Sequence, residues 1–152
     1  MHPQAAWQLI EVTDSRGEVI EPEWLARAEA VHRQLRPQLP PEYTPALQRV
    51  FDGGGRMVVA SDGQHVMGLA VYRTQINTFA GFHLYVDDLI TDEASRSRGV
   101  GQALLGHCEA RARALGCKLL TLESGVQRQR AHRFYFREGL AIDAYSFSKP
   151  LV

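Results

Sequence analysis

The alternation of apolar and polar positions along the chain predicts both strands and helices. AWQLIEV, at residues 6–12, alternates with the two-residue period of a strand. Between residues 22 and 36 the apolar side chains recur at helical spacing: Trp24, Leu25, Ala28, Val31, His32 and Leu35. A shorter helix is expected around residues 46–51. The chain therefore opens with one strand and two helices.

The middle of the sequence predicts three strands. Three consecutive glycines, residues 53–55, mark a turn before RMVVAS. Asp62-Gly63 then separates RMVVAS from HVMGLAVYRT, which is a hairpin pattern. FHLYVDDLIT, at residues 82–91, is predicted to form the next strand.

The second half alternates between the two types of element. A helix is expected from Gly99 to Leu115, then a short strand in CKLLTLES (117–124) whose continuous apolar run is typical of burial on both faces. A helix over 127–138 and a final strand in IDAYSFSKPL (142–151) complete the series. This order predicts an α/β fold with a mixed sheet, antiparallel at first and with at least one parallel crossover.

Composition and charge narrow the function classes. The 152 residues suit one domain, 1–152, and 17 basic residues balance 17 acidic ones. This balance argues against nucleic acid or an anionic membrane as a partner. No apolar run is long enough to span a bilayer, and MHPQAAWQLIEV lacks the pattern of a secretory signal, so we expect a cytoplasmic protein. We expect Cys108 and Cys117 to be buried, reduced thiols, and the histidine spacing predicts no metal site.

The segment ASRSRGVGQA, at residues 94–103, lies between a predicted strand and a predicted helix. The first turn of a helix presents unpaired N–H groups, and glycine lets a ligand approach the backbone closely. Arg96 and Arg98 add positive charge beside Gly99 and Gly101. The spacing fits neither the dinucleotide fingerprint nor the Walker loop. The residues alone leave two interpretations open, a diphosphate site and a charged turn.

Two motifs follow one another in the second half of the chain. The first is Arg96-x-x-Gly99-x-Gly101 after DDLIT, and the second is RQRAHRFYFREGL, at residues 128–140. Together they resemble the GNAT family of N-acetyltransferases: the first looks like the family's pyrophosphate-binding motif, and the second is similar to the family's later conserved segment. The resemblance covers residues 55 to 150, and the closing segment is also similar to that of aminoalkylphosphonate N-acetyltransferases. It implies a single-domain, mostly antiparallel sheet that splits in a V between two parallel strands, with about four flanking helices.

The resemblance also implies acetyl-CoA as the cosubstrate. The pantetheine arm is expected along backbone groups at the end of the 82–91 strand, and the pyrophosphate on the amides that follow. The later segment is expected to complete the cofactor site. The residues so implied are Leu89, Ile90, Thr91, Arg96, Ser97, Arg98, Gly99, Val100, Gly101, Gln102, Arg128, Ala131 and Phe134.

Acetyl transfer needs a neutral amine, a polarised thioester carbonyl and a proton for the departing thiolate. The resemblance places the family's general-acid tyrosine at Tyr135, which could otherwise be a core aromatic. It matches Asp87 to an acidic residue that deprotonates the ammonium through water. Strand alternation puts Asp87 and Asp88 on opposite faces, and the bulge common in relatives would change which of them faces the site. His83 is a weaker candidate for the base.

One position departs from the family pattern. Relatives commonly have Asn where this chain has Arg128, which contacts a CoA phosphate or only solvent. Arg130, Arg133 and Arg137 form a helical stripe that is either solvated or faces the mouth of the site. In the second case the acceptor would carry an acidic group.

The sequence therefore predicts an enzyme that moves an acetyl group from acetyl-CoA to the primary amine of a small molecule, without a covalent enzyme intermediate. Two alternatives stay open: a protein Nα- or lysine acetyltransferase, and a non-catalytic sensor that binds acyl-CoA. The residues that would choose the acceptor, 22–54, contain no recognisable motif. Dimers are frequent among relatives, so a homodimer is compatible with the resemblance.

Overall fold

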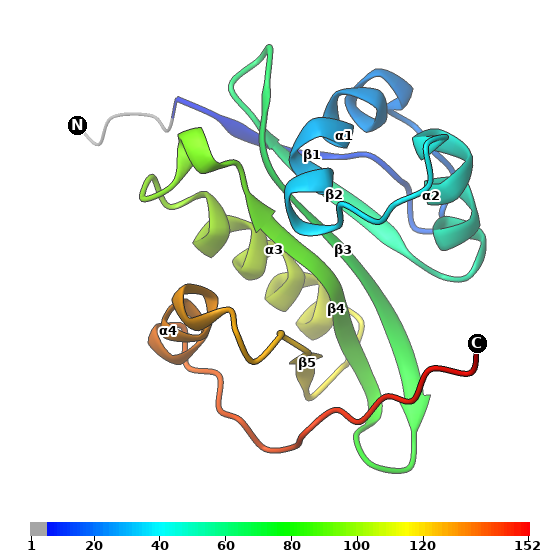
Figure 1. Ribbon diagram of the computed structural model, residues 1–152, viewed down its shortest axis with the longest axis vertical. Helices are drawn as coiled ribbons and strands as arrows, with labels where there is room; N and C mark the ends of the chain where they lie inside the picture. Colours follow the sequence, from blue (N-terminus) through cyan, green and yellow to red (C-terminus); the bar gives the residue numbers. More distant parts are fainter. Residues whose placement is uncertain (1–5) are drawn as a thin grey trace. The chain divides into compact units, whose positions relative to one another are not determined.

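The computed structural model describes residues 6–152 and contains one five-stranded sheet with four α-helices (Figure 1). The strands, in spatial order, are β1 (Gln8–Glu11), β2 (Arg56–Ser61), β3 (Val66–Asn77), β4 (Gly81–Thr91) and β5 (Leu120–Leu122). The helices are α1 (Pro22–Leu35), α2 (Tyr43–Asp52), α3 (Val100–Ala114) and α4 (Gln129–Arg137), and the 3-10 helix η1 (Glu93–Ser95) precedes α3. The predicted α/β class is confirmed.

The sheet is antiparallel from β1 to β4. β5 follows β4 through α3, the type of crossover that joins parallel strands, and the sheet is therefore mixed. The backbone N–H of Leu84 in β4 donates to the carbonyl of Leu119, just before β5, over 3.1 Å.

Side chains alternate between the two faces of the sheet, and each face has its own cover. Leu69 and Val71 of β3 belong to the core under α1 and α2. Tyr72 points to the other face, where its ring lies edge-on to His107 of α3 at a centroid distance of 6.1 Å. α1 and α2 therefore cover one face and α3 covers the other (Figure 1).

Gly68 of β3 lets the first turns of α3 approach the sheet closely. A Cβ at this position would lie 2.8 Å from the carbonyl oxygen of Ile90 and 2.9 Å from Val100 Cγ1. Neither distance is possible for a real side chain, so glycine is required here. The beginning of α3 is thus fixed against β3 and the end of β4.

The chain forms two compact units, of which the first ends at Thr121 and the second comprises Leu122–Val152. Cys108 and Cys117 are buried free thiols, as expected. Among the helices of residues 6–152, none is both long and apolar enough to cross a membrane.

Two predicted features of the later chain are wrong. CKLLTLES forms a strand of only three residues, each half-buried, and not a strand buried on both faces. Residues 142–151, predicted as a final strand, form no regular element, and Tyr145 and Phe147 are exposed. Apolar alternation by itself does not form a strand, because a strand also needs a hydrogen-bonded neighbour.

Candidate active site

β4 contains a bulge at Asp87. Val86 pairs with Tyr72 and Asp88 pairs with Val71, so Asp87 is an extra residue without a partner in β3. Paired residues share a face, and Asp88 therefore lies on the face of Val71, under α1. The predicted separation of Asp87 and Asp88 onto opposite faces is wrong, because the bulge shifts the alternation by one residue.

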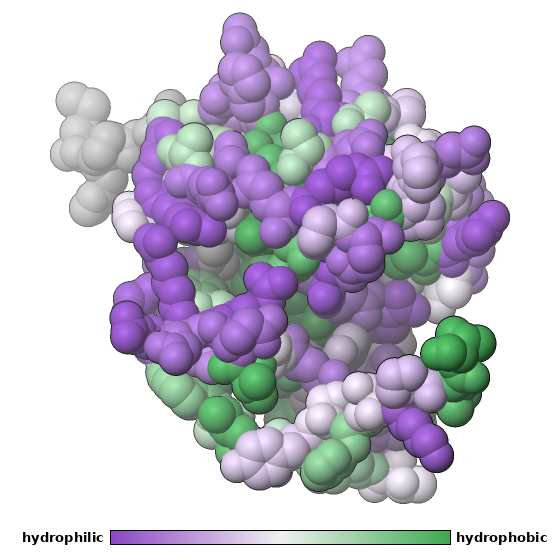
Figure 2. All heavy atoms as spheres, viewed as in Figure 1, coloured by the Kyte–Doolittle hydropathy of each residue, from purple (hydrophilic) through white to green (hydrophobic). Residues whose placement is uncertain are grey.

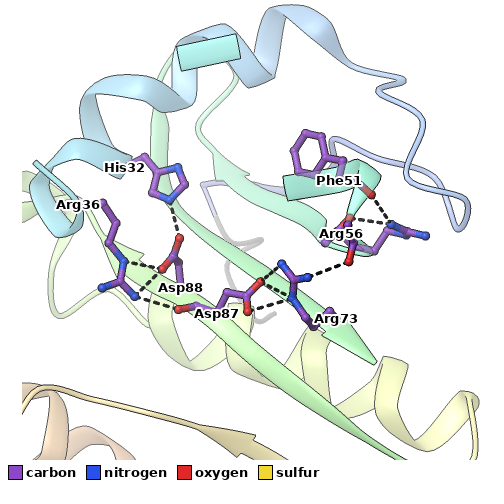
Figure 3. Close-up of polar contacts among 9 residues, drawn as sticks. His32, Arg36, Phe51, Arg56, Arg73, Asp87 and Asp88 are labelled. Atoms are coloured by element: carbon purple, nitrogen blue, oxygen red, sulfur yellow. Dashed lines mark hydrogen bonds and ion pairs between the residues drawn. The ribbon is translucent and has the colours of Figure 1, made fainter. Parts of the chain in front are cut away.

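Asp88 is held by two side chains near the end of α1 (Figure 3). His32 Nε2 lies 2.7 Å from one carboxylate oxygen, and Arg36 Nε donates to the other over 2.7 Å. The Asp88 side chain is only 13% exposed. Arg36 also donates from Nη2 to the backbone carbonyl of Asp87 over 3.0 Å, which ties α1 to the bulge itself.

Asp87 is held by Arg73 of β3. The guanidinium donates from Nε and Nη2 to the Asp87 carboxylate, with distances of 2.9 and 2.7 Å to Oδ2. Arg73 Nη1 donates to the carbonyl of Gly53, just after α2, over 3.0 Å. The bidentate geometry fixes the carboxylate in the plane of the guanidinium (Figure 3).

The two neighbouring carboxyl groups have pKa values shifted in opposite directions. Burial raises the pKa of Asp87, and the bond from Arg73 offsets this only in part. Burial also acts to raise the pKa of Asp88, but the hydrogen bonds from His32 and Arg36, together with the Arg36 charge, outweigh it and hold that pKa below its usual range. A pair with divergent pKa values is typical of sites where one group exchanges a proton and the other stays charged.

His83, the weaker candidate for the base, is only 2% exposed. Its Nδ1 lies 2.9 Å from the carbonyl of Gly81, at the start of the same strand. This contact is typical of a histidine that fixes a turn.

The segment between β4 and α3 presents backbone to solvent. Gly99 caps α3 with a φ of 80°, a left-handed conformation that favours glycine, and a Cβ there would meet no atom within 4 Å. Arg96, Ser97 and Arg98 are exposed, and the Arg96 guanidinium lies 4.0 Å from the Glu93 carboxylate. The N–H groups of the first turn of α3 have no acceptor within the helix. A glycine cap, the backbone amides of a helix N-terminus and two arginines fit the charge and bulk of a pyrophosphate.

The predicted pantetheine contacts, Leu89, Ile90 and Thr91, form the half-buried end of β4. Ile90 also packs against the core under α1 and α2. The order of the predicted site positions along this segment is therefore the bulge, the end of β4, and the loop that caps α3.

The second unit contains α4 with the remaining predicted residues. Phe134 and Tyr135 are half-buried, with ring centroids 5.5 Å apart, and Arg128 caps the helix. Arg130, Arg133 and Arg137 are exposed, and Arg137 lies over the Phe134 ring at 5.8 Å from its centroid. Within residues 6–152 no three His, Cys, Asp or Glu side chains are grouped so that they could hold a metal ion.

Sequence reasoning did not identify His32, Arg36 and Arg73 as site residues. In the sequence, His32 is one position of the apolar stripe of its helix. A single polar side chain in such a stripe is the signal that could have identified it as a site residue. Arg36 and Arg73 lie 52 and 14 residues from the aspartates they contact. No local pattern could have predicted these two pairs.

Comparisons with known proteins agree with this architecture. The acetyltransferase (GNAT) family model matches residues 22–140. The chain is 33% identical over 132 residues to the uncharacterized N-acetyltransferase YhdJ of Bacillus subtilis, covering 85% of this chain and 92% of that protein. It is 34% identical over 77 residues to an aminoalkylphosphonate N-acetyltransferase of Salmonella typhimurium, covering 46% and 50% of the two chains.

The fold is also similar to a solved structure of the aminoglycoside N-acetyltransferase AAC(6′)-Iy in complex with CoA. The TM-score is 0.79 at 12% identity, with 100% of this chain and 99% of the other covered. At this identity the likeness concerns the fold alone. The family match and the similarity to YhdJ over most of both chains lead to one conclusion: the chain belongs to the acetyltransferase (GNAT) family and is an acetyl-CoA-dependent N-acetyltransferase.

Proposed function

We propose that the protein transfers an acetyl group from acetyl-CoA directly to the primary amine of a small molecule that also carries an acidic group. The observation that carries this proposal is the bulge in β4, which brings Asp87 and Asp88 to one face beside Arg36 and Arg73. Both units are proposed to act as one acetyltransferase domain, in the cytoplasm and with the capacity to form a homodimer.

Acetyl-CoA, when bound, supplies the activated thioester. Its pyrophosphate would be held by the amides of residues 97–102, with Arg96 and Arg98 beside them. Its pantetheine arm would lie along Leu89, Ile90 and Thr91 at the end of β4. In the second unit, Arg128, Ala131 and Phe134 are the proposed contacts.

Asp87 is the proposed base, through a water molecule, because its pKa is raised while its carboxylate is held in a fixed orientation. A backbone amide at the bulge would polarise the thioester carbonyl. Tyr135 is the proposed proton donor to the thiolate of CoA, since a phenol holds its proton at neutral pH.

Direct transfer is favoured over a covalent enzyme intermediate. Burial raises the pKa of the Cys108 thiol to about 12, so almost none of it is thiolate at neutral pH. Cys117 is also buried. The nucleophile that attacks the thioester is therefore the acceptor amine itself.

The charges around the bulge favour an acceptor with one amine and one acidic group. Both aspartates already have an arginine, and the Arg36 side chain is 37% exposed. A polycation such as an aminoglycoside would need further carboxylates beyond these two, each of which already pairs with an arginine. The partial similarity to an aminoalkylphosphonate N-acetyltransferase supports the same class of acceptor.

The experiment is a screen for acceptor-dependent release of CoA. The panel includes 2-aminoethylphosphonate, amino acids, polyamines, aminoglycosides and a peptide with a free N-terminus and a lysine. We expect the highest kcat/KM for an amine that carries phosphonate or carboxylate. A preference for the aminoglycosides or polyamines would contradict the proposed class, and a preference for the peptide would indicate a protein acetyltransferase.

A further inference from the structure

Asp88 is the end of a buried chain of polar groups that joins α2, α1 and β4. The Tyr43 hydroxyl lies 2.9 Å from His32 Nδ1, and His32 Nε2 lies 2.7 Å from the Asp88 carboxylate. Tyr43 and His32 are only 3% and 1% exposed, and their rings meet edge-on. In a chain of polar groups buried this deeply, each hydrogen bond needs one donor and one acceptor. The bonds of the chain must therefore all run in the same direction.

The chemistry of the two ends fixes that direction. An ionised carboxylate only accepts hydrogen bonds, so His32 must donate to Asp88 from Nε2. Burial raises the pKa of Tyr43 far above its ordinary value, and the phenol therefore keeps its proton and can donate it to Nδ1. With a single proton on the imidazole ring, at Nε2, every bond of the chain is made: Tyr43 donates to His32, and His32 donates to Asp88.

Asp88 remains open to a further partner. One of its oxygens is contacted by His32 Nε2 and the other by Nε and Nη2 of Arg36, whereas a carboxylate can accept about four hydrogen bonds. Asp87 is bound on both oxygens by Arg73 and has a raised pKa, whereas the pKa of Asp88 is held below its usual range. Of the two, Asp88 is therefore the better suited to stay charged beside an ammonium group.

We propose that Asp88 is the anchor for the ammonium group of the acceptor, and that His32, held in one tautomer by Tyr43, is the positioning residue that keeps this carboxylate charged and oriented. In this arrangement Asp88 binds the ammonium group of the acceptor. Asp87 accepts the proton of that group through a water molecule. This inference rests on the proposed function and adds to it how the amine is recognised.

The test combines three variants with a spectroscopic measurement. His32→Leu removes both hydrogen bonds, His32→Gln keeps an N–H donor that can reach Asp88, and Tyr43→Phe removes only the bond to Nδ1. His65→Leu is the matched control, because the His65 side chain is 77% exposed. Each variant is assayed for kcat and for KM of the acceptor found in the screen, and for acetyl-CoA affinity by calorimetry.

We expect His32→Leu to raise the acceptor KM by about 10- to 100-fold while kcat stays within about threefold and acetyl-CoA affinity is unchanged. His32→Gln should recover most of the loss, and Tyr43→Phe should have an intermediate effect. A fall in kcat with an unchanged acceptor KM would assign His32 to proton transfer and overturn the inference. An acceptor KM that no His32 variant changes would overturn it as well.

The tautomer is measured independently of activity. Nitrogen-15 spectra of the labelled protein, with the His32 signals assigned from the His32→Gln variant, should show a proton on Nε2 and none on Nδ1. A proton on Nδ1 would overturn the inference even if the Leu variant failed to fold. Failure of the unsubstituted protein to acetylate any amine would refute the proposed function instead, and this outcome is distinct from every result above.

Discussion

The β4 bulge and the loop before α3 are neighbouring parts of one chain segment. The two proposed binding sites in them are nevertheless built differently, one from side chains and the other from the backbone. At the bulge, Asp87 and Asp88 are half-buried and fixed by side chains from β3 and α1. In the loop, Arg96 and Arg98 are exposed, and the fixed feature is the left-handed backbone of Gly99. On the face seen in Figure 2 polar residues predominate, and apolar ones lie both between them and at exposed places such as the C-terminal end, where Leu151 and Val152 are exposed.

This difference indicates which substitutions each region tolerates. A site made of backbone amides is insensitive to most side-chain changes and sensitive to a change at its glycine. A site made of side chains depends on residues far away in the sequence, such as His32 and Arg73. We therefore expect substitution of one residue, Gly99, to disrupt the proposed acetyl-CoA site before α3. The proposed acceptor site at the bulge should be sensitive to substitutions at several residues.

Gly99→Asp should have the largest effect, because it disrupts the proposed pyrophosphate site on the backbone amides at the start of α3. It adds a negative charge where the pyrophosphate is expected and strains a φ of 80°. We expect a loss of acetyl-CoA affinity of at least about 100-fold by calorimetry. Gly63→Asp is the matched control, because Gly63 also has a positive φ and open surroundings. Equal affinity in both variants would show that the loop is only a charged turn.

Tyr135→Phe tests a residue outside both regions. Removing the phenolic proton should lower kcat by about 10- to 1000-fold, with little change in acetyl-CoA affinity or acceptor KM. The exposed Tyr145 provides the control, Tyr145→Phe, which should leave kcat unchanged. If kcat is unaltered in Tyr135→Phe, the general acid is another group.

Asp87→Asn should have a smaller effect that depends on pH. Because burial raises the pKa of Asp87, its carboxylate is lost earlier than an ordinary one as the pH falls, and activity in the parent should decline accordingly. In the variant, the rate should be about tenfold lower between the pKa of Asp87 and that of the amine, and closer to the parent at high pH, where the amine is already neutral.

The measurement for Asp87→Asn is a pH profile of kcat/KM, with the exposed Asp143→Asn as the control. Profiles of equal shape in Asp87→Asn and the parent would exclude Asp87 as the base. This experiment tests the role of Asp87, and the His32 variants test the role of Asp88. Together they distinguish the functions of the two aspartates.

Much of the fold was predictable because its signals are local. The two early helices, the hairpin at Asp62-Gly63 and the helix after Gly99 occur where periodicity and turn residues predict them. The bulge was expected only from the family resemblance, since nothing in VDDLI distinguishes a bulged strand from a regular one. The partners of the aspartates could not be predicted, because they depend on the register of β3 and on the position of α1.

The extra residue at Asp87 also has a consequence for how this protein can change over evolutionary time. Since Val86 and Asp88 already pair with consecutive residues of β3, deleting residue 87 would restore a regular ladder without moving any other residue out of register. The architecture would survive the loss of one of its two carboxylates. A deletion within a regular strand moves the residues that follow it to the other face of the sheet, but at this position a shorter chain would keep its register and lose only the proposed base.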